Sequence, residues 1–287
     1  MVRRDAVYNC YKKYVLEFAN VKYPPVRKRK YSLEYYLDKF TLILGDVVCW
    51  EALKNTNINK THNYHWKTIY NEYNKWSNDG IFKDAYNKFM EKNYFKMSKV
   101  RKNKKINLFI DVTKISNKHG SENIGINVEY KKKNVTSLTA ICDDNKLPLG
   151  VTYMDTNLRK TKTGKHTIKH DINGVQKTLD SIPFGLKKYV TVQLIGDKGY
   201  ATNRKFNVFG REVRMIHPKK KNQKRKNTKR EKKLLSKRHK IENFFALLKK
   251  YNRIMLRYER KIVHYMSFVY IGLLDFMARN LINITES

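Results

Sequence analysis

Apolar residues in the first third of the chain recur every three or four positions, which is the spacing of an α-helix. The helices that this pattern predicts cover residues 33–48, 66–76 and 81–95. Ser32 stands where a helix N-cap is expected, and Ser77-Asn78-Asp79-Gly80 stands where the second helix should end. A polar connection over 55–63 separates the first two helices. The pattern therefore predicts an all-helical region over residues 31–100.

Beyond residue 105 the apolar residues gather in short runs that predict β-strands. These runs cover residues 106–112, 135–142, 148–154, 189–195 and 212–216. The segment Asp143-Asp144-Asn145-Lys146 predicts the turn of a hairpin between the second and third strands. Helices are predicted over residues 171–181 and 201–209, and from Leu234 past Leu248. The predicted fold class is therefore α/β, with a mixed sheet flanked by helices.

These patterns divide the chain into three parts. Residues 1–30 are predicted to form a basic arm or linker, because Pro24-Pro25 is closely followed by Arg27-Lys28-Arg29-Lys30. Residues 31–100 should form the helical domain and residues 101–287 the α/β domain. Helices joined by a polar connection are what a helix-turn-helix requires, and a plain helical bundle is the alternative.

The composition favours the first of these alternatives. The 287 residues include 62 Lys and Arg against 25 Asp and Glu, a net charge of +37. A compact chain that repels itself so strongly is expected to have a polyanionic partner, here nucleic acid. With 41% apolar and 13% aromatic residues the chain can fill a core, which excludes a fully disordered protein. Charge alone does not separate an enzyme from a packaging protein.

Cysteine and histidine spacing excludes two further classes of protein. The three cysteines, Cys10, Cys49 and Cys142, are too few and too far apart for a secreted disulfide scaffold. None of them is paired at C-x2-C spacing, which argues against a zinc finger or ribbon. His166 and His170 have no third or fourth candidate ligand nearby in the sequence.

The most apolar stretch of the chain is Ile262–Ala278, which includes His264 and Asp275. A helix that spans a bilayer needs about 20 apolar residues, and this stretch is shorter. A buried or dimer-forming C-terminal helix over 262–280 is therefore predicted. Because no signal-peptide pattern opens the chain, we expect an intracellular protein that associates with DNA.

Three acidic residues stand out in this basic chain. Asp111 and Asp197 each follow a predicted strand, and Glu242 borders the apolar stripe of a predicted helix. Ligands gather at the carboxyl ends of strands in α/β sheets. Three carboxylates brought together require a cation, and Mg²⁺ or Mn²⁺ prefers oxygen ligands. Taken singly, each residue is more simply a turn, cap or surface residue; the set predicts a metal site.

The segments around these residues resemble the motifs of DDE transposases, most closely the insertion-sequence five group. The segments are Ile110-Asp111-Val112-Thr113, Gly196-Asp197-Lys198-Gly199-Tyr200 and Arg238-x3-Glu242-Asn243-Phe244-Phe245-x3-Lys249. Residues 66–70 and 76–82 resemble the N-terminal DNA-binding helices of that group, and His170-Asp171 is a further similar element. The resemblance covers roughly residues 35–280.

The resemblance implies an RNase H-like catalytic domain whose metal-binding triad is Asp111, Asp197 and Glu242. Two divalent ions, Mg²⁺ or Mn²⁺, would be bound there and would activate water for attack on a phosphodiester. The released 3′-OH would then attack target DNA. Arg238 and Lys249 match two basic positions of the family pattern, whereas Leu235 replaces its tyrosine.

The sequence also suggests how double-stranded DNA is contacted. Side chains near the start of the helix at Trp66 are predicted to read bases, while Trp66 itself is predicted to be core; the readers are His65, Lys67, Thr68 and Asn71. Arg238, Lys249 and Lys198 are expected to contact phosphates. Residues 219–233, with ten Lys and Arg, predict a basic loop that orders on DNA. A homodimer or larger assembly is expected for pairing two DNA ends.

Three alternatives remain open at this level. A domesticated DNA-binding protein could keep the fold without cutting DNA, although the intact triad argues against it. A metal-dependent nuclease of the same fold could cut without joining the ends. A basic structural protein, such as a ribosomal component, would not need carboxylates at these strand ends.

Overall fold

The structure is a computed structural model of the 287-residue chain. It describes residues 2–24, 31–45, 49–55, 65–98, 105–127, 133–154, 159–160, 166–167, 171–185, 191–219 and 225–285. The chain forms two compact units. The helical unit consists of residues 1–93, 118–122 and 248–287, and the sheet unit consists of residues 94–117 and 123–247.

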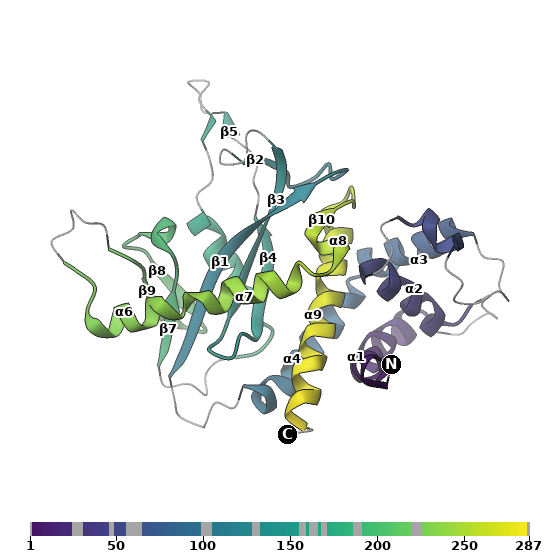
Figure 1. The fold of residues 1–287 in the computed structure, drawn as a ribbon, viewed down its shortest axis with the longest axis horizontal. Helices are drawn as coiled ribbons and strands as arrows, with labels where there is room; N and C mark the ends of the chain where they lie inside the picture. Colours follow the sequence, from purple (N-terminus) through teal and green to yellow (C-terminus); the bar gives the residue numbers. More distant parts are fainter. Residues whose placement is uncertain are drawn as a thin grey trace. The chain divides into compact units, whose positions relative to one another are not determined.

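The sheet unit is built on a mixed β-sheet, drawn in teal and green in Figure 1. Its strands are β1 (Ile106–Asn117), β2 (Gly125–Asn127), β3 (Lys133–Cys142), β4 (Pro148–Met154), β7 (Val192–Ile195), β8 (Lys205–Val208) and β9 (Arg211–Ile216). The central order is β4-β3-β1-β7-β9-β8. β1, β7 and β9 are parallel, while β3, β4 and β8 pair antiparallel with their neighbours. The predicted mixed sheet is confirmed.

Short helices complete the sheet unit. They are η2 (Asp171–Gly174), α5 (Val175–Asp180), η3 (Lys198–Tyr200), α6 (Lys229–Leu235), η4 (Ser236–Arg238) and α7 (His239–Leu248), and β5 (Arg159–Lys160) pairs with β6 (His166–Thr167). The single helix predicted from Leu234 past Leu248 is instead divided into α6, η4 and α7 and ends at Leu248. It begins earlier than predicted, because Thr228 and Glu231 form a capping box. Residues 229–233 of the predicted basic loop are therefore helical, and residues 220–224 lie outside the described part.

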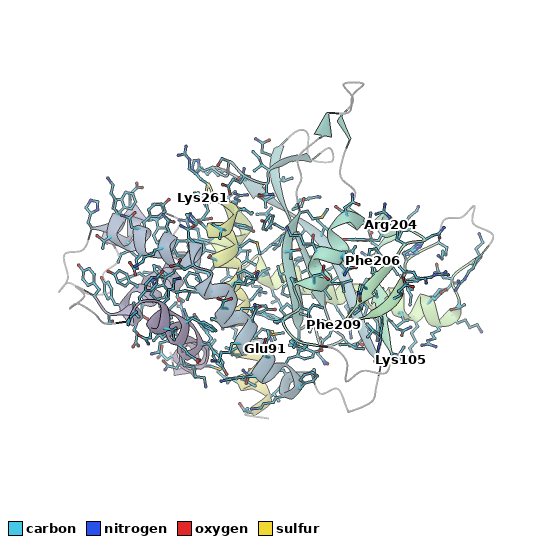
Figure 2. The ribbon with its side chains drawn as sticks, turned by 180° about the vertical axis from the view of Figure 1, so that it is seen from behind. Glu91, Lys105, Arg204, Phe206, Phe209 and Lys261 are labelled. Atoms are coloured by element: carbon cyan, nitrogen blue, oxygen red, sulfur yellow. The ribbon has the colours of Figure 1, made fainter. Side chains whose placement is uncertain are left out.

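The helix predicted over residues 201–209 is wrong, because this segment contains strand β8. Its side chains alternate, with Phe206 and Val208 buried and Lys205 and Asn207 exposed, which is the period of a strand. The hairpin to β9 turns at Phe209-Gly210, where both residues have positive φ, 52° and 83°. Such a two-residue turn matches the twist of paired strands. Figure 2 labels Phe206 and Phe209 on this hairpin.

The helical unit contains most of the aromatic core. Its elements are α1 (Val2–Lys22), α2 (Leu33–Gly45), η1 (Glu51–Asn55), α3 (Trp66–Asn78), α8 (Asn252–Met255), β10 (Leu256–Arg257) and α9 (Ile262–Thr285), and α4 (Ile81–Met97) begins in it. The predicted cap is confirmed, since the Tyr35 N–H donates to Ser32 Oγ at 3.1 Å. Tyr73 stacks on Phe268 with ring centroids 4.5 Å apart, which joins α3 to α9.

Two expectations about the ends of the chain differ from the structure. Most of the predicted basic arm is helix α1, whose residues Val7, Tyr11, Val15 and Ala19 recur every four positions and are buried. The proline and basic segment that suggested a linker lies mostly outside the described residues. At the other end, residues 248–287 group with the helical unit, although the sequence placed them in the α/β domain.

Helix α9 is buried within its own unit. Phe268, Leu273 and Met277 are fully covered, and α9 packs against α1 and α3. Of the two predicted roles for this segment, the structure therefore supports the buried helix. None of the described helices has the length and apolar character needed to span a membrane.

Gly150 on β4 allows α5 to approach the sheet closely. A Cβ at this position would lie 2.5 Å from the Thr178 carbonyl oxygen and 2.8 Å from Ser181 Oγ. Gly150→Ala should therefore lower the free energy of unfolding by about 1–3 kcal/mol, the usual cost of overpacking. Urea unfolding of the two proteins measures this difference. Gly45→Ala, where a Cβ meets nothing within 4 Å, is the matched control and should be close to neutral.

Candidate active site

Two of the predicted acidic residues lie at adjacent parallel strands. Asp197 follows the end of β7 as predicted, whereas Asp111 lies within β1, which continues to Asn117 because its second half stays paired with β3. Phe109 of β1 is paired with Ile195 of β7, and Asp111 and Asp197 each follow two residues later. Because the strands are parallel and in register, the two aspartates reach the same level of the sheet. Asp197 raises the pKa of Asp111, so their charges act on each other. The register of β1 and β7 therefore brings the two carboxylates together.

The turn after β7 fixes the position of Asp197. Its carboxylate accepts a hydrogen bond from the Gly199 N–H at 2.7 Å and caps the short helix η3. A Cβ on Gly196 would lie 2.6 Å from Met215 Sδ and 3.1 Å from the Tyr200 ring, so only glycine fits there without a shift. Lys198 is exposed on this turn. The sequence Gly-Asp-Lys-Gly thus serves close packing and the placement of one carboxylate.

Arg238 lies between Asp111 and Glu242. Its Nη2 is 3.6 Å from Asp111 Oδ2 and 4.0 Å from Glu242 Oε1. The side chains of Arg238 and Asp111 are mostly covered, each 21% exposed, whereas that of Glu242 is 60% exposed. The structure therefore brings together four of the residues that the sequence singled out, with Asp197 beside Asp111.

Burial dominates the electrostatics of Asp111. The pKa of Asp111 is raised to about 6, chiefly by burial and to a smaller extent by the nearby charges of Asp197 and Glu242. Arg238 and a hydrogen bond from the Val112 N–H act in the opposite direction and lower it. A carboxylate with this balance is short of positive charge, since one guanidinium lies beside Asp111 and Glu242 and Asp197 adds a third negative charge. This site therefore favours the approach of a cation.

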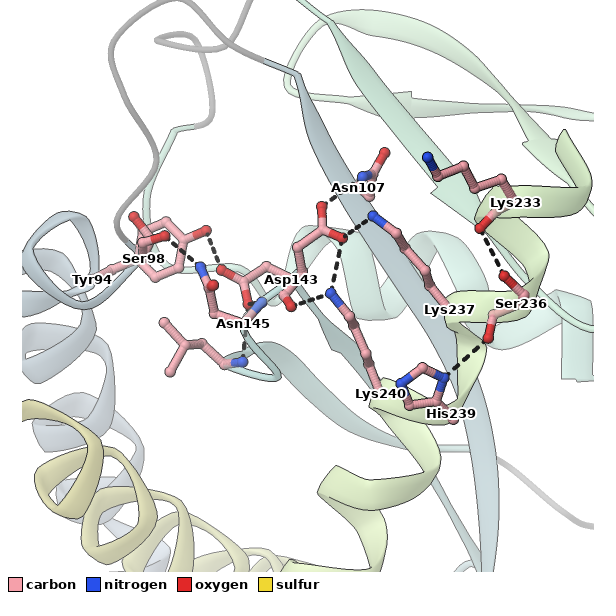
Figure 3. A network of polar contacts seen from close by, with 12 residues as sticks. Tyr94, Ser98, Asn107, Asp143, Asn145, Lys233, Ser236, Lys237, His239 and Lys240 are labelled. Atoms are coloured by element: carbon pink, nitrogen blue, oxygen red, sulfur yellow. Dashed lines mark hydrogen bonds and ion pairs between the residues drawn. The ribbon is translucent and has the colours of Figure 1, made fainter. Parts of the chain in front are cut away.

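Asp144 joins the helix that carries Glu242 to the β3–β4 turn. Its Oδ1 is 3.1 Å from Lys240 Nζ and 3.6 Å from Lys237 Nζ, and its Oδ2 accepts a 2.5 Å hydrogen bond from Asn107. The Lys240 ammonium also donates to the Asp144 carbonyl. Figure 3 shows Asn107 of β1, Lys237 of η4 and Lys240 of α7 pointing toward this turn. We call Asp144, Asn107, Lys237 and Lys240 the helix clamp.

The neighbouring Asp143 has a different role. Its buried carboxylate accepts the N–H groups of Asn145 and Leu147 at 2.8 and 3.0 Å and the Tyr94 hydroxyl at 3.1 Å. Burial raises the pKa of Asp143 to about 6, although these hydrogen bonds lower it. Figure 3 shows this second group of contacts beside the helix clamp. Asp143 therefore shapes the turn that Asp144 uses to hold α7.

Two further residues near the site were not assigned a role from the sequence. Asp171, part of the recognised His170-Asp171 element, lies 3.5 Å from Lys114 Nζ. Tyr200 is buried and its hydroxyl has no hydrogen-bond partner among the described residues. Burial raises the pKa of Tyr200 well above its usual value, and the charges of Asp111, Asp171 and Asp197 raise it further. Tyr200 follows Asp197 in the same motif, which is the signal that could have found it.

The donor chemistry of the site suits a hard divalent cation, since Asp111, Asp197 and Glu242 offer only carboxylate oxygens. Within the described residues, however, no three His, Cys, Asp or Glu side chains are close enough together to hold one metal ion. Arg238 provides the positive charge between two of the three acids. The three carboxylates therefore fit a hard divalent cation in their chemistry. In this structure their arrangement is the one stabilised by the Arg238 guanidinium.

The other predicted contact residues lie in the helical unit. Lys249 directly follows α7, and partial burial lowers its pKa. The four predicted base readers are exposed at the start of α3; they are His65, Lys67, Thr68 and Asn71. His65 also caps this helix, because its Nδ1 accepts the Lys67 N–H at 3.3 Å. Trp66 is half-buried, so the prediction that it belongs to the core holds only in part.

Comparison with known proteins gives one match. A family model described as the transposase DDE domain matches residues 102–274. No curated protein and no solved structure matches the chain. The matched range begins just before β1 and includes all of Asp111, Asp197 and Glu242. The mixed sheet and its flanking helices fit the RNase H-like domain that the sequence led us to expect.

Asp111→Asn should stabilise the metal-free protein at neutral pH. The pKa of Asp111 is raised in the folded state, so its stability contribution is present below the unfolded value of about 4 and is lost as pH rises through about 6. The asparagine variant should match the wild type near pH 4 and exceed it by about 2 kcal/mol at pH 8. Urea unfolding in EDTA across this range measures the difference. Asp180→Asn, at an exposed carboxylate, is the control, and equal pH profiles for all three proteins would contradict the prediction.

Asp144→Asn should loosen the helix that carries Glu242. Two ion pairs would be lost, and the amide hydrogen exchange of residues 236–242 should accelerate roughly tenfold, which corresponds to about 1.4 kcal/mol of local stability. Hydrogen exchange followed by mass spectrometry resolves this segment. Glu212→Gln removes an exposed ion pair to Lys205 on the β8–β9 hairpin and should leave residues 236–242 unchanged. An unchanged hydrogen-exchange rate of residues 236–242 in Asp144→Asn would show that the helix clamp does not stabilise the helix that carries Glu242.

Proposed function

The chain belongs to the transposase DDE family, and from this premise we propose that it binds the ends of a mobile DNA element, cleaves them and joins them to target DNA. The observation that carries the proposal is that Asp111 and Glu242 both lie at Arg238, while Asp197 acts on Asp111 from the neighbouring strand. We assign it to the insertion-sequence five group of that family, because its three motifs resemble those of that group most closely. A basic structural protein would gain nothing from acidic side chains whose mutual repulsion costs free energy of folding.

Asp111, Asp197 and Glu242 are the residues that would hold two Mg²⁺ or Mn²⁺ ions. When bound, such ions activate a nucleophile and stabilise the leaving oxygen of a phosphodiester. The β1–β7 register holds the two aspartates, and the helix clamp holds Glu242. The guanidinium of Arg238, which lies beside Asp111 and Glu242, would bind a DNA phosphate at the edge of this site through paired N–H donors.

We also propose that the helical unit supplies much of the DNA binding. Its exposed residues at the start of α3 would enter the major groove as in a helix-turn-helix, with α4 as the adjoining helix. Lys198 and Lys249, together with the basic segment 219–233, would contact phosphates. Because two element ends must be brought together, the active form is a homodimer or a larger assembly.

Removing any one acid should abolish cleavage and leave DNA binding intact. Asp111→Asn, Asp197→Asn and Glu242→Gln each remove one oxygen ligand with little change in volume, so nicking of end DNA should fall at least about 100-fold. Nicking is measured as the conversion of a supercoiled plasmid that carries the element to its relaxed form. A gel-shift assay measures binding of end DNA. Glu212→Gln is the control, because this exposed glutamate belongs to an ion pair on the β8–β9 hairpin.

The products distinguish the alternatives. Labelled end DNA that becomes joined to target plasmid supports a transposase, whereas nicking without joining indicates a nuclease of the same fold. DNA binding with no metal-dependent nicking indicates a domesticated binding protein. A variant that lacks one acid and still nicks at the wild-type rate would remove that acid from the proposed site.

A further inference from the structure

The helical unit contains a cavity of about 480 Å³ that the proposed cleavage chemistry does not use. This volume lies within the range of about 300–1,000 Å³ typical of sites for small ligands. Its walls come from the segments around η1, α3 and the chain between α8 and α9. The aromatic residues that line it are Trp50, Trp66, Tyr70 and Tyr258.

These aromatic rings form connected walls. The Tyr70 ring lies 5.4 Å from that of Trp50 and 6.2 Å from that of Trp66, measured between centroids. Trp66 is only half-buried although it lies on the first turn of α3 beside a well-packed core. An aromatic wall of this kind binds a flat ring by stacking, and it tolerates any of the bases.

The cavity is also lined by a buried ion pair that is incompletely hydrogen-bonded. Arg253 Nη1 lies 3.4 Å from Glu259 Oε1, and both side chains are at least nine-tenths covered, 2% and 4% exposed. The Arg253 guanidinium also lies over the Tyr258 ring, 4.9 Å from its centroid. Among the described residues, neither Arg253 Nε nor Glu259 Oε2 has a hydrogen-bond partner. Buried polar atoms without partners are unusual, and here a donor and an acceptor occur together.

Two cations also line the cavity. Lys118 and Arg260 are exposed, so a negatively charged group attached to a ring in the cavity would meet them; the remaining lining residues are Cys49, Glu51, His119 and His264. One N–H donor, one carboxylate oxygen, aromatic walls and exposed cations together match a nucleobase that carries a phosphate. A purely apolar ligand would leave both buried polar atoms without partners.

We propose that this cavity binds one unpaired guanine nucleotide. The Arg253 N–H would donate to O6 or N7 of the base, and the Glu259 carboxylate would accept its N1–H or N2–H. The nucleotide could be a base displaced from duplex DNA, an assignment that rests on the proposed function, or a free nucleotide. Cytosine presents fewer acceptors to an arginine and leaves part of the cavity unfilled.

Tryptophan fluorescence provides a direct test, because two of the three tryptophans of the chain line the cavity. The full chain with Asp111→Asn, in magnesium-free buffer, would be titrated with dGMP and dCMP. The same protein would be titrated with three duplexes that carry one extrahelical dG, one extrahelical dC or no extrahelical base. We expect the fluorescence to be quenched by guanine at concentrations at least about tenfold below those needed for cytosine.

Two variants and one control connect the signal to the cavity. Trp66→Ala should weaken guanine binding at least about fivefold through lost stacking. Glu259→Gln should reduce the preference for guanine over cytosine, because the amide nitrogen cannot accept the base N–H. Phe18→Ala removes a half-buried aromatic ring of α1 outside the cavity and should change neither value. Circular dichroism identifies any variant that fails to fold. If Glu259→Gln fails to fold, Trp66→Ala still tests the proposal.

The outcomes separate the two proposals. Preference for the extrahelical dG duplex, or for dGMP alone, supports the site and identifies its source. Equal affinity for guanine and cytosine, or guanine binding that survives Trp66→Ala unchanged, overturns the inference. If no duplex binds at all, the proposed function fails, whereas normal duplex binding without any response to guanine refutes only the cavity assignment.

Discussion

The candidate active site depends on one charge, the guanidinium of Arg238. Asp111, Asp197 and Glu242 repel one another, and burial of Asp111 makes the repulsion stronger, because less water screens it. Arg238 contacts Asp111 and Glu242 at 3.6 and 4.0 Å and so compensates part of this cost. One arginine cannot neutralise three carboxylates. The same excess of negative charge that requires Arg238 therefore leaves the site with an affinity for further cations.

The three acids are held by two kinds of constraint. Asp111 and Asp197 are placed by backbone pairing, since the parallel register of β1 and β7 sets their level on the sheet. Glu242 is on a helix and needs side chains to hold it, which the ion pairs of Asp144 with Lys237 and Lys240 provide. Backbone pairing is rigid, whereas ion pairs to lysine can exchange for phosphate. The proposed function therefore implies that a DNA backbone would compete with Asp144 for the two lysines that fix this helix.

How much was predictable follows from the range of each interaction. The two aspartates could be identified because an apolar run followed by an acid is a local pattern, and the sheet could be predicted too; that β1 continues beyond Asp111 to Asn117 could not, because its second half is polar and is held by pairing with β3. The helix over residues 2–22 was missed because its buried positions are mixed with basic residues that resemble an arm. Strand β8 was missed because four residues show too little alternation to outweigh a helical interpretation. The helix clamp could not be predicted, since Asp144 and Lys240 are 96 positions apart and meet only through the fold.

The candidate active site and the cavity in the helical unit contain the same kind of ion pair. In each, an arginine lies beside a carboxylate, Arg238 with Asp111 and Arg253 with Glu259, and its Nε has no partner among the described residues. A purely structural ion pair is expected to satisfy its donors, because a buried N–H without an acceptor weakens the folded state. Carboxylates are scarce in a chain with a net charge of +37, yet two of them, Asp111 and Glu259, lie beside arginines that keep one N–H without a partner among the described residues. Such a pair gains its missing hydrogen bond only when a ligand atom binds to the unpaired N–H. Binding at either place would therefore remove a cost that the folded chain carries without a ligand.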